Sequence, residues 1–96
     1  MATSKEYKNY ILELLSNLED ITSKPMMGEY LLYYKDILFG GIYDDKFLIK
    51  ETKSNNKYQL KEEIPYTNAK KMYLLDSENQ DFIKEIIIKT YEDLKK

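Results

Sequence analysis

The sequence predicts a two-layer α+β domain, in which an antiparallel meander sheet carries the N-terminal and C-terminal helices on one face. Residues 21–50 contain three runs of aromatic and aliphatic residues, separated by the polar pairs Lys35-Asp36 and Asp44-Asp45. That pattern is typical of strands joined by tight turns. Apolar residues recur at helical spacing near both ends of the chain. The length of 96 residues suits one core, so residues 1–96 are predicted to form a single domain.

The first helix is predicted over residues 3–18. Thr3 is the expected N-cap, and Glu6 follows three residues later, as in a capping box. The apolar residues of this segment follow the i, i+3, i+4, i+7 pattern and form one stripe, which consists of Tyr7, Tyr10, Ile11, Leu14, Leu15 and Leu18. The helix is therefore expected to bury this stripe.

Proline and glycine shape the expected sheet. Residues 21–27 read as a first extended segment, and Pro25 places it at a sheet edge or interrupts it, because proline cannot donate to a ladder. Gly28 marks a bend or bulge before the next strand. Gly40 and Gly41 lie within a strand, which indicates a close backbone approach or strong curvature.

The two polar pairs fix an expected register. If each is a two-residue turn, Leu32 lies opposite Phe39 and Gly41 lies opposite Leu48. A bulge or a longer loop would shift this register. Residues two apart share a face, so the predicted core face carries Leu31, Tyr33, Leu38, Gly40, Ile42, Phe47 and Ile49. The other face is mixed and carries Tyr30, Leu32, Tyr34, Ile37, Phe39, Gly41, Tyr43, Lys46, Leu48 and Lys50.

The second half of the chain completes the domain. Residues 52–63 are polar and predict either a short helix or an exposed loop, and residues 71–75 predict a last strand. Ser77 is the expected cap of the C-terminal helix, with Gln80 as its capping-box partner. The apolar stripe of that helix consists of Phe82, Ile83, Ile86, Ile87, Tyr91 and Leu94.

Composition excludes several kinds of chemistry. The chain has no cysteine and no histidine, so thiolate catalysis, disulfides and the usual general base and metal ligand are absent. The fifteen basic residues are all lysines and the net charge is −2, so no overall field attracts nucleic acid or an acidic membrane. The N-terminus resembles neither a signal peptide nor a membrane span, and a cytoplasmic protein is expected. No catalytic residue, cofactor or metal site is predicted.

Three groups of residues carry a resemblance to a known family. They are Ser23, Lys24, Met26, Gly28, Glu29 and Tyr30, then Phe39, Gly40, Asp45 and Lys50, then Pro65, Tyr66, Ala69, Lys70 and Met72. Their order between two terminal helices resembles the TfoX N-terminal domain family over essentially the whole chain. Met27 stands where an aromatic residue is common in that family. The resemblance implies a small two-layer α+β domain related to regulators of competence genes, whose second, C-terminal domain is expected to be absent here.

Two groups of charged residues each allow two interpretations. Asp44-Asp45, joined by Glu29 or Asp36, could bind a metal or perform acid–base chemistry. Aspartate is common in hairpin turns, and that role is favoured. A phosphate-binding patch could be formed by five lysines, which are Lys53, Lys57, Lys61, Lys70 and Lys71. Neighbouring glutamates dilute its charge, so a solvated surface is favoured.

The mixed sheet face is predicted to bind a partner. Lysines would border a group of six aromatic or aliphatic residues on this face. The six residues are Tyr30, Leu32, Tyr34, Phe39, Tyr43 and Leu48. One layer of helices would leave this face uncovered, and exposed apolar patches usually mark binding surfaces. We therefore expect a non-enzymatic regulatory or protein-interaction module that binds a protein partner or a second copy of itself. A nucleic-acid-associated transcriptional regulator is the alternative, and a small-molecule-binding protein is a third hypothesis.

Overall fold

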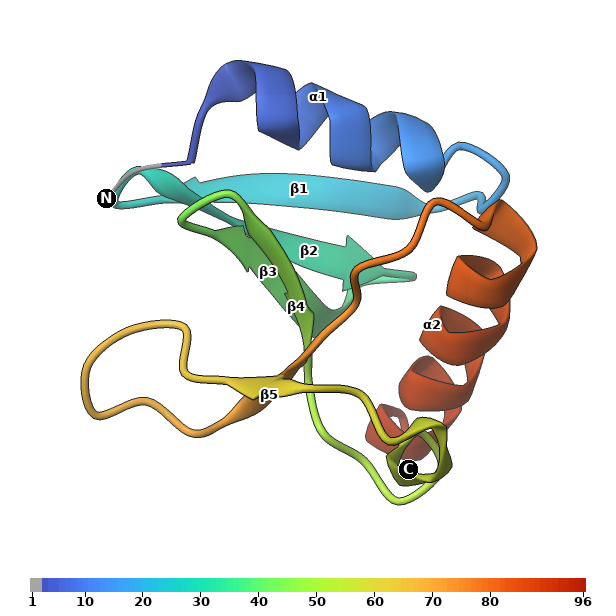
Figure 1. Ribbon diagram of the computed structural model, residues 1–96. Coiled ribbons are helices and arrows are strands. Elements are labelled where there is room, and N and C mark those ends of the chain that lie inside the picture. The colour runs from blue at the N-terminus through green and yellow to red at the C-terminus, as the bar shows by residue number, and fades with distance from the viewer. Residues whose placement is uncertain (1–2) are drawn as a thin grey trace.

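A computed structural model describes residues 3–96 and has the α+β class that the sequence predicts (Figure 1). Within this range α1 (Lys5–Leu14) and α2 (Gln80–Leu94) accompany a six-stranded antiparallel sheet and the short 3-10 helix η1 (Asn56–Tyr58). The strands are β1 (Ile21–Met26), β2 (Glu29–Tyr34), β3 (Ile37–Tyr43), β4 (Lys46–Ile49), β5 (Glu62–Glu63) and β6 (Met72–Leu74). Their spatial order is β1-β2-β3-β4-β6-β5, and Figure 1 shows α1 above β1 and α2 at the side of the sheet.

The first helix, predicted over residues 3–18, begins later and ends earlier than predicted. Ser4 is the N-cap, since its Oγ accepts a hydrogen bond of 3.1 Å from the Tyr7 backbone N–H. The predicted cap, Thr3, is wrong because its hydroxyl bonds to Glu29 and to the Ile42 carbonyl instead. The regular helix stops at Leu14 rather than at residue 18. The last two residues of the apolar stripe, Leu15 and Leu18, lie in the turn and bend that follow.

The cap predicted for the second helix is also wrong. Asn79, not Ser77, is the N-cap of α2, and its Oδ1 accepts a hydrogen bond of 3.1 Å from the Phe82 backbone N–H. Ser77 lies two residues outside, where its Oγ accepts from the Asn79 N–H at 3.1 Å. Both residue types are favoured caps, so the sequence alone does not choose between them.

Within residues 3–96, no helix has the length and hydrophobicity needed to cross a membrane.

The meander is confirmed with both predicted turns. Lys35, Asp36, Asp44 and Asp45 all have positive φ, between 50° and 67°, as two-residue hairpins of the primed type require. Strand β1 lies at a sheet edge, one of the two outcomes predicted from Pro25, because an edge strand has one side without a ladder partner. The Met27-Gly28 bend joins β1 to β2, also with positive φ at both residues.

A shift in the pairing of β2 with β3 changes which side chains of β2 face the core. The Tyr34 to Ile37 pairing is as predicted, but the β2–β3 register shifts between Leu32 and Tyr33, so that Leu32 lies opposite Gly40 rather than Phe39. A bulge of this kind adds one residue to one strand and turns the following side chains to the other face. The predicted Gly41 to Leu48 pairing beyond it is confirmed.

The bulge explains why the predicted core face is partly wrong. Ile42, Phe47 and Ile49 are fully buried in the main core, as expected. Leu31 and Tyr33 are only half-buried, while their neighbours Leu32 and Tyr34 join the core. The main core also takes side chains from both long helices, chiefly Ile11, Leu15, Leu18, Ile83, Ile86 and Ile87. Both helices therefore contribute to a single core against one face of the sheet.

Gly40 and Gly41 permit two close approaches. A Cβ on Gly40 would lie 2.2 Å from the Leu48 carbonyl oxygen and 2.9 Å from the Ile49 Cα, which are backbone atoms of the neighbouring strand. A Cβ on Gly41 would lie 2.7 Å from the Tyr30 carbonyl oxygen and 2.7 Å from the Tyr43 ring. The predicted close backbone approach is thus found at both glycines.

We expect Gly40→Ala to destabilise the domain by about 1–3 kcal/mol, because the added carbon forces two paired strands apart. Urea denaturation followed by circular dichroism measures this loss. Ser23→Ala, on the exposed edge strand, is the control and should change the free energy of unfolding by less than about 0.5 kcal/mol. Equal stability of the two variants would contradict the close approach.

The polar segment at residues 52–63 is held to α2 by a buried asparagine. Asn55 is fully buried, and its Oδ1 accepts from the Thr52 N–H at 2.9 Å. Its Nδ2 donates to the Lys50 carbonyl and to Thr90 Oγ1, both at 2.8 Å. Of the two predicted possibilities, a short helix or an exposed loop, the segment contains both, because η1 lies between irregular stretches. The brief strand β5 at the end of the segment was not predicted.

Candidate functional site: an apolar cleft on the second sheet face

The predicted partner surface does not exist as one patch. Leu32 and Phe39 have 0% of their surface exposed and lie in the main core. Tyr30 and Tyr34 also pack into that core, whereas Tyr43 and Leu48 belong to a separate cluster on the opposite face. The grouping is wrong because it assumed an unbroken register between β2 and β3. The expectation that one sheet face lacks a helix layer is retained, with a different set of residues on it.

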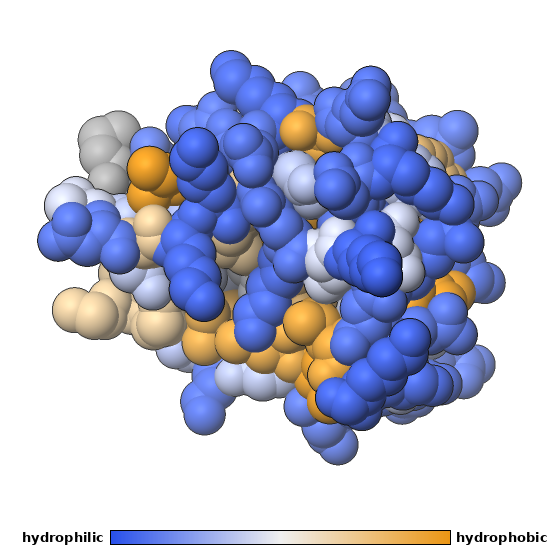
Figure 2. Space-filling model, turned by 90° about the horizontal axis from the view of Figure 1, so that it is seen from below, coloured by the Kyte–Doolittle hydropathy of each residue, from blue (hydrophilic) through white to orange (hydrophobic). Residues whose placement is uncertain are grey.

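The second face forms a cleft with a volume of about 830 Å³. Its floor includes the buried cluster of Tyr43, Leu48 and Met72, against which Met26, Leu31 and Leu74 pack. The lining residues are Met26, Leu31, Leu38, Gly40, Tyr43, Lys50, Glu51, Pro65, Tyr66, Ala69, Lys70, Lys71, Met72 and Leu94. Figure 2 shows a face of the molecule on which hydrophobic side chains form a strip bordered by hydrophilic ones.

The loop between β5 and β6 forms one wall of the cleft. Figure 1 shows residues 64–71 projecting from the sheet as an extended loop. Pro65, Tyr66 and Ala69 line the cleft, and the Tyr66 ring lies 6.2 Å from the Tyr43 ring, centroid to centroid. Tyr66 is 58% exposed and Ile64 is 56% exposed, so this wall presents large apolar side chains to solvent.

Tyr43 supplies a polar group at the floor. Its ring is 6% exposed and packs over Gly41, which has no side chain to displace it. Burial is the main cause that raises the pKa of Tyr43 above 10.0, and the neighbouring Tyr66 and Glu29 add to the effect. A tyrosine hydroxyl is a hydrogen-bond donor at neutral pH, so Tyr43 offers a donor at the floor of the cleft.

The rim of the cleft carries charged side chains of both signs. Lys50, Lys70 and Lys71 face a single lining carboxylate, Glu51. Burial and a hydrogen bond with Glu62 raise the pKa of Glu51, while Lys71 acts in the opposite direction. The lining of the cleft therefore holds three lysines and one carboxylate, so positive charges outnumber negative ones.

The candidate carboxylate pair Asp44-Asp45 serves as a hairpin turn, the favoured interpretation. The Asp45 carboxylate accepts from the Ser4 N–H at 2.9 Å, and Glu29 Oε1 accepts from the Thr3 hydroxyl at 2.7 Å and from the Asp44 N–H at 3.1 Å. These bonds attach the start of the described chain to the β3–β4 turn. Within residues 3–96 no three carboxylates are placed to hold a metal ion together.

The five candidate phosphate-contacting lysines do not form an unopposed basic patch. Lys61 pairs with Glu63 at 3.5 Å, and Lys71 pairs with Glu62 at 4.0 Å. All five, including Lys53, Lys57 and Lys70, are exposed. The arrangement matches the solvated surface that the sequence favoured.

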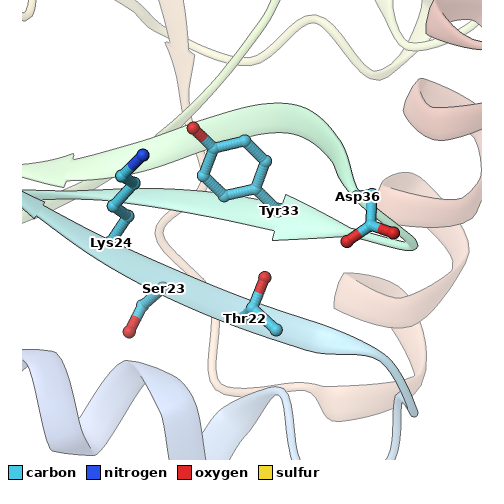
Figure 3. A pocket seen from close by; sticks show the side chains of 5 residues that line it. All are labelled: Thr22, Ser23, Lys24, Tyr33 and Asp36. Atoms are coloured by element: carbon cyan, nitrogen blue, oxygen red, sulfur yellow. The ribbon is translucent and has the colours of Figure 1, made fainter.

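A second, more polar hollow lies between β1 and β2 at the sheet edge. Its volume is about 330 Å³, and it is lined by Thr22, Ser23, Lys24, Tyr33 and Asp36. Figure 3 shows Lys24 and Tyr33 pointing away from α1, whereas Ser23 points toward α1. The side chains do not converge on one point, so we regard the larger apolar cleft as the candidate site.

Sequence reasoning missed most of the cleft residues as a site. Met26, Leu31 and Leu38 come from three different strands, and only the bulge turns Leu31 to this face. The one available signal was composition in residues 64–70, where Pro65 and Tyr66 stand in a polar, turn-rich loop. An aromatic residue in such a loop is a typical feature of binding surfaces.

Comparison with known proteins identifies a family. The family model described as the TfoX N-terminal domain matches residues 13–86, which include β1 to β6 and most of the lining of the cleft. No curated protein shows a significant match to the chain.

Proposed function

The chain belongs to the TfoX N-terminal domain family, and from this premise we propose that it is a non-enzymatic regulatory module that binds a partner protein. The partner docks in the apolar cleft on the second sheet face. We further propose that it acts in the cytoplasm.

The main support is the apolar character of an uncovered sheet face. Met26, Leu31 and Leu38 are half-buried in this cleft, to whose lining the helices contribute only Leu94 at the end of α2. Apolar residues surrounded by a charged rim are the usual anatomy of a protein interface. The groups that the cleft offers suit packing and charge pairing.

A second support comes from where the resemblance residues lie. Many of those that carried the family resemblance line this one cleft, although they come from different parts of the chain, namely Met26, Gly40, Lys50, Pro65, Tyr66, Ala69, Lys70 and Met72. Gly40 is required by the close approach of the β4 backbone, but the lysines and the loop residues do not belong to the main core. A shared binding role accounts for their placement.

Capture of partners by wild-type protein, followed by affinity measurements with a cleft variant of unchanged charge, tests the proposal. Wild-type protein is immobilised on a solid support and incubated with an extract of cells that express it. Each captured protein is then purified, and its affinity is measured directly. Leu31→Gln removes apolar surface from the cleft without adding charge, and Tyr10→Gln removes a 42% exposed tyrosine on α1 outside the cleft. We expect at least one partner whose affinity falls about tenfold with Leu31→Gln and is unchanged with Tyr10→Gln.

Two results would contradict the proposal. One is a partner whose affinity is insensitive to Leu31→Gln while circular dichroism shows that variant folded. The other is binding of random-sequence DNA in a salt series, with micromolar affinity that weakens steeply as salt rises. The second result would favour the nucleic-acid-associated regulator instead.

A further inference from the structure

Two lysines that line the cleft, Lys50 and Lys70, form no ion pair in the described chain. In the described chain, Lys46 and Lys61 pair with Glu63, and Lys71 pairs with Glu62, whereas neither Lys50 nor Lys70 takes part in an ion pair. Lys50 is also only partly exposed, at the end of β4. An ammonium group next to apolar surface is stabilised by a carboxylate that is brought to it.

We infer that the partner segment that docks in the cleft carries acidic side chains next to apolar ones. This inference rests on the proposed function and names the chemistry of the partner. The apolar floor of Met26, Leu31 and Met72 selects the aliphatic or aromatic side chains of the segment. Lys50 and Lys70 select its aspartates or glutamates, and the Tyr43 hydroxyl offers a further donor.

The remaining charges near the rim are mixed, because Lys71 is paired with Glu62. Glu51 is the one lining carboxylate, and its neighbours Glu62 and Lys71 share its charge environment. A basic segment would meet the two unpaired lysines, which costs affinity through like-charge repulsion. Charge complementarity thus favours an acidic partner over a basic one.

A random linear peptide library displayed on phage tests the inference without a known partner. The library is selected on wild-type protein, on the double variant Lys50→Glu with Lys70→Glu, and on the control double variant Lys5→Glu with Lys84→Glu. The control lysines are exposed on α1 and α2 and do not line the cleft. Circular dichroism establishes that each variant is folded before selection.

We expect wild-type and control protein to enrich peptides that combine leucine, isoleucine or phenylalanine with aspartate or glutamate. Synthetic copies of these peptides should bind the Lys50→Glu, Lys70→Glu variant about tenfold more weakly than wild type. The same variant should enrich lysine- or arginine-containing peptides instead. NMR titration should show the largest shift changes at Met26, Tyr43 and Met72.

Three outcomes would overturn the inference. They are selection of basic peptides by wild-type protein, selection with no preference for charge, and no peptide that perturbs the cleft residues. Self-association through the cleft, seen by sedimentation and abolished by Leu31→Gln, would identify a second copy as the occupant. Basic or uncharged peptides bound in the cleft would leave the proposed function standing, so the two proposals fail separately.

Discussion

Leu32→Lys should unfold the domain at room temperature. Leu32 has 0% of its surface exposed and lies in the main core between the sheet and the helices. Loss of a buried leucine alone costs about 2–5 kcal/mol, and an ammonium group without a partner adds a further penalty of desolvation. A domain of this size has a stability of about 5–15 kcal/mol, so little or none would remain. Far-ultraviolet circular dichroism and sedimentation of the purified variant measure the result.

Leu31→Lys is the matched control for this experiment. Leu31 is the preceding residue on the same strand, but it is half-buried on the cleft face. A lysine there can lay its aliphatic stem along the cleft and keep its charge in water. We expect a folded protein that loses less than about 1.5 kcal/mol. The reverse order of the two effects would mean that the bulge between Leu32 and Tyr33 is absent and that the unbroken register is correct.

Asn55→Ala should cost about 2–4 kcal/mol, which is large for a residue in a polar segment. The change leaves the Thr52 N–H and the Lys50 carbonyl without their side-chain partners at a buried position. Each buried polar group that loses its hydrogen bond costs about 1–3 kcal/mol. The Thr90 hydroxyl, also fully buried, keeps its own bond to the Ile86 carbonyl at 2.7 Å. Thermal and urea denaturation give the loss of stability.

Asn9→Ala on the exposed face of α1 is the control for this loss and should be neutral or slightly stabilising. Hydrogen exchange adds a local measurement, since residues 50–55 and the last turns of α2 should lose protection together in Asn55→Ala. A change in the free energy of unfolding below about 0.5 kcal/mol, with protection retained in both segments, would show that Asn55 does not hold them together.

The fold class was accessible from the sequence because its signals are local. The helices follow from apolar spacing such as Ile83, Ile86 and Ile87, which holds wherever the helix packs. The turns follow from polar pairs between apolar runs, and Lys35-Asp36 and Asp44-Asp45 fall where predicted. The edge position of β1 follows from Pro25, because only a strand with a free side tolerates it well.

The candidate site was largely inaccessible because its lining depends on pairing between strands. Leu31 and Leu32 are equally apolar, and nothing in either side chain decides which one enters the core. The N-caps were also inaccessible from the sequence, because they depend on which hydrogen bonds the neighbouring residues form. Ser4 and Asn79 cap the helices, while Thr3 and Ser77 bond elsewhere.

The sequence by itself determined the helices, the two hairpin turns and the presence of two glycines that need close approach. The tertiary structure decided the bulge beside Leu32, the burial of Asn55 and the gathering of Met26, Leu31 and Tyr66 around one cleft. Periodicity and turn chemistry act over a few neighbouring residues. Register and burial depend on the free energy of contacts between segments far apart in the chain, where the close approach of Gly40 to β4 and the hydrogen bonds of Asn55 select one arrangement.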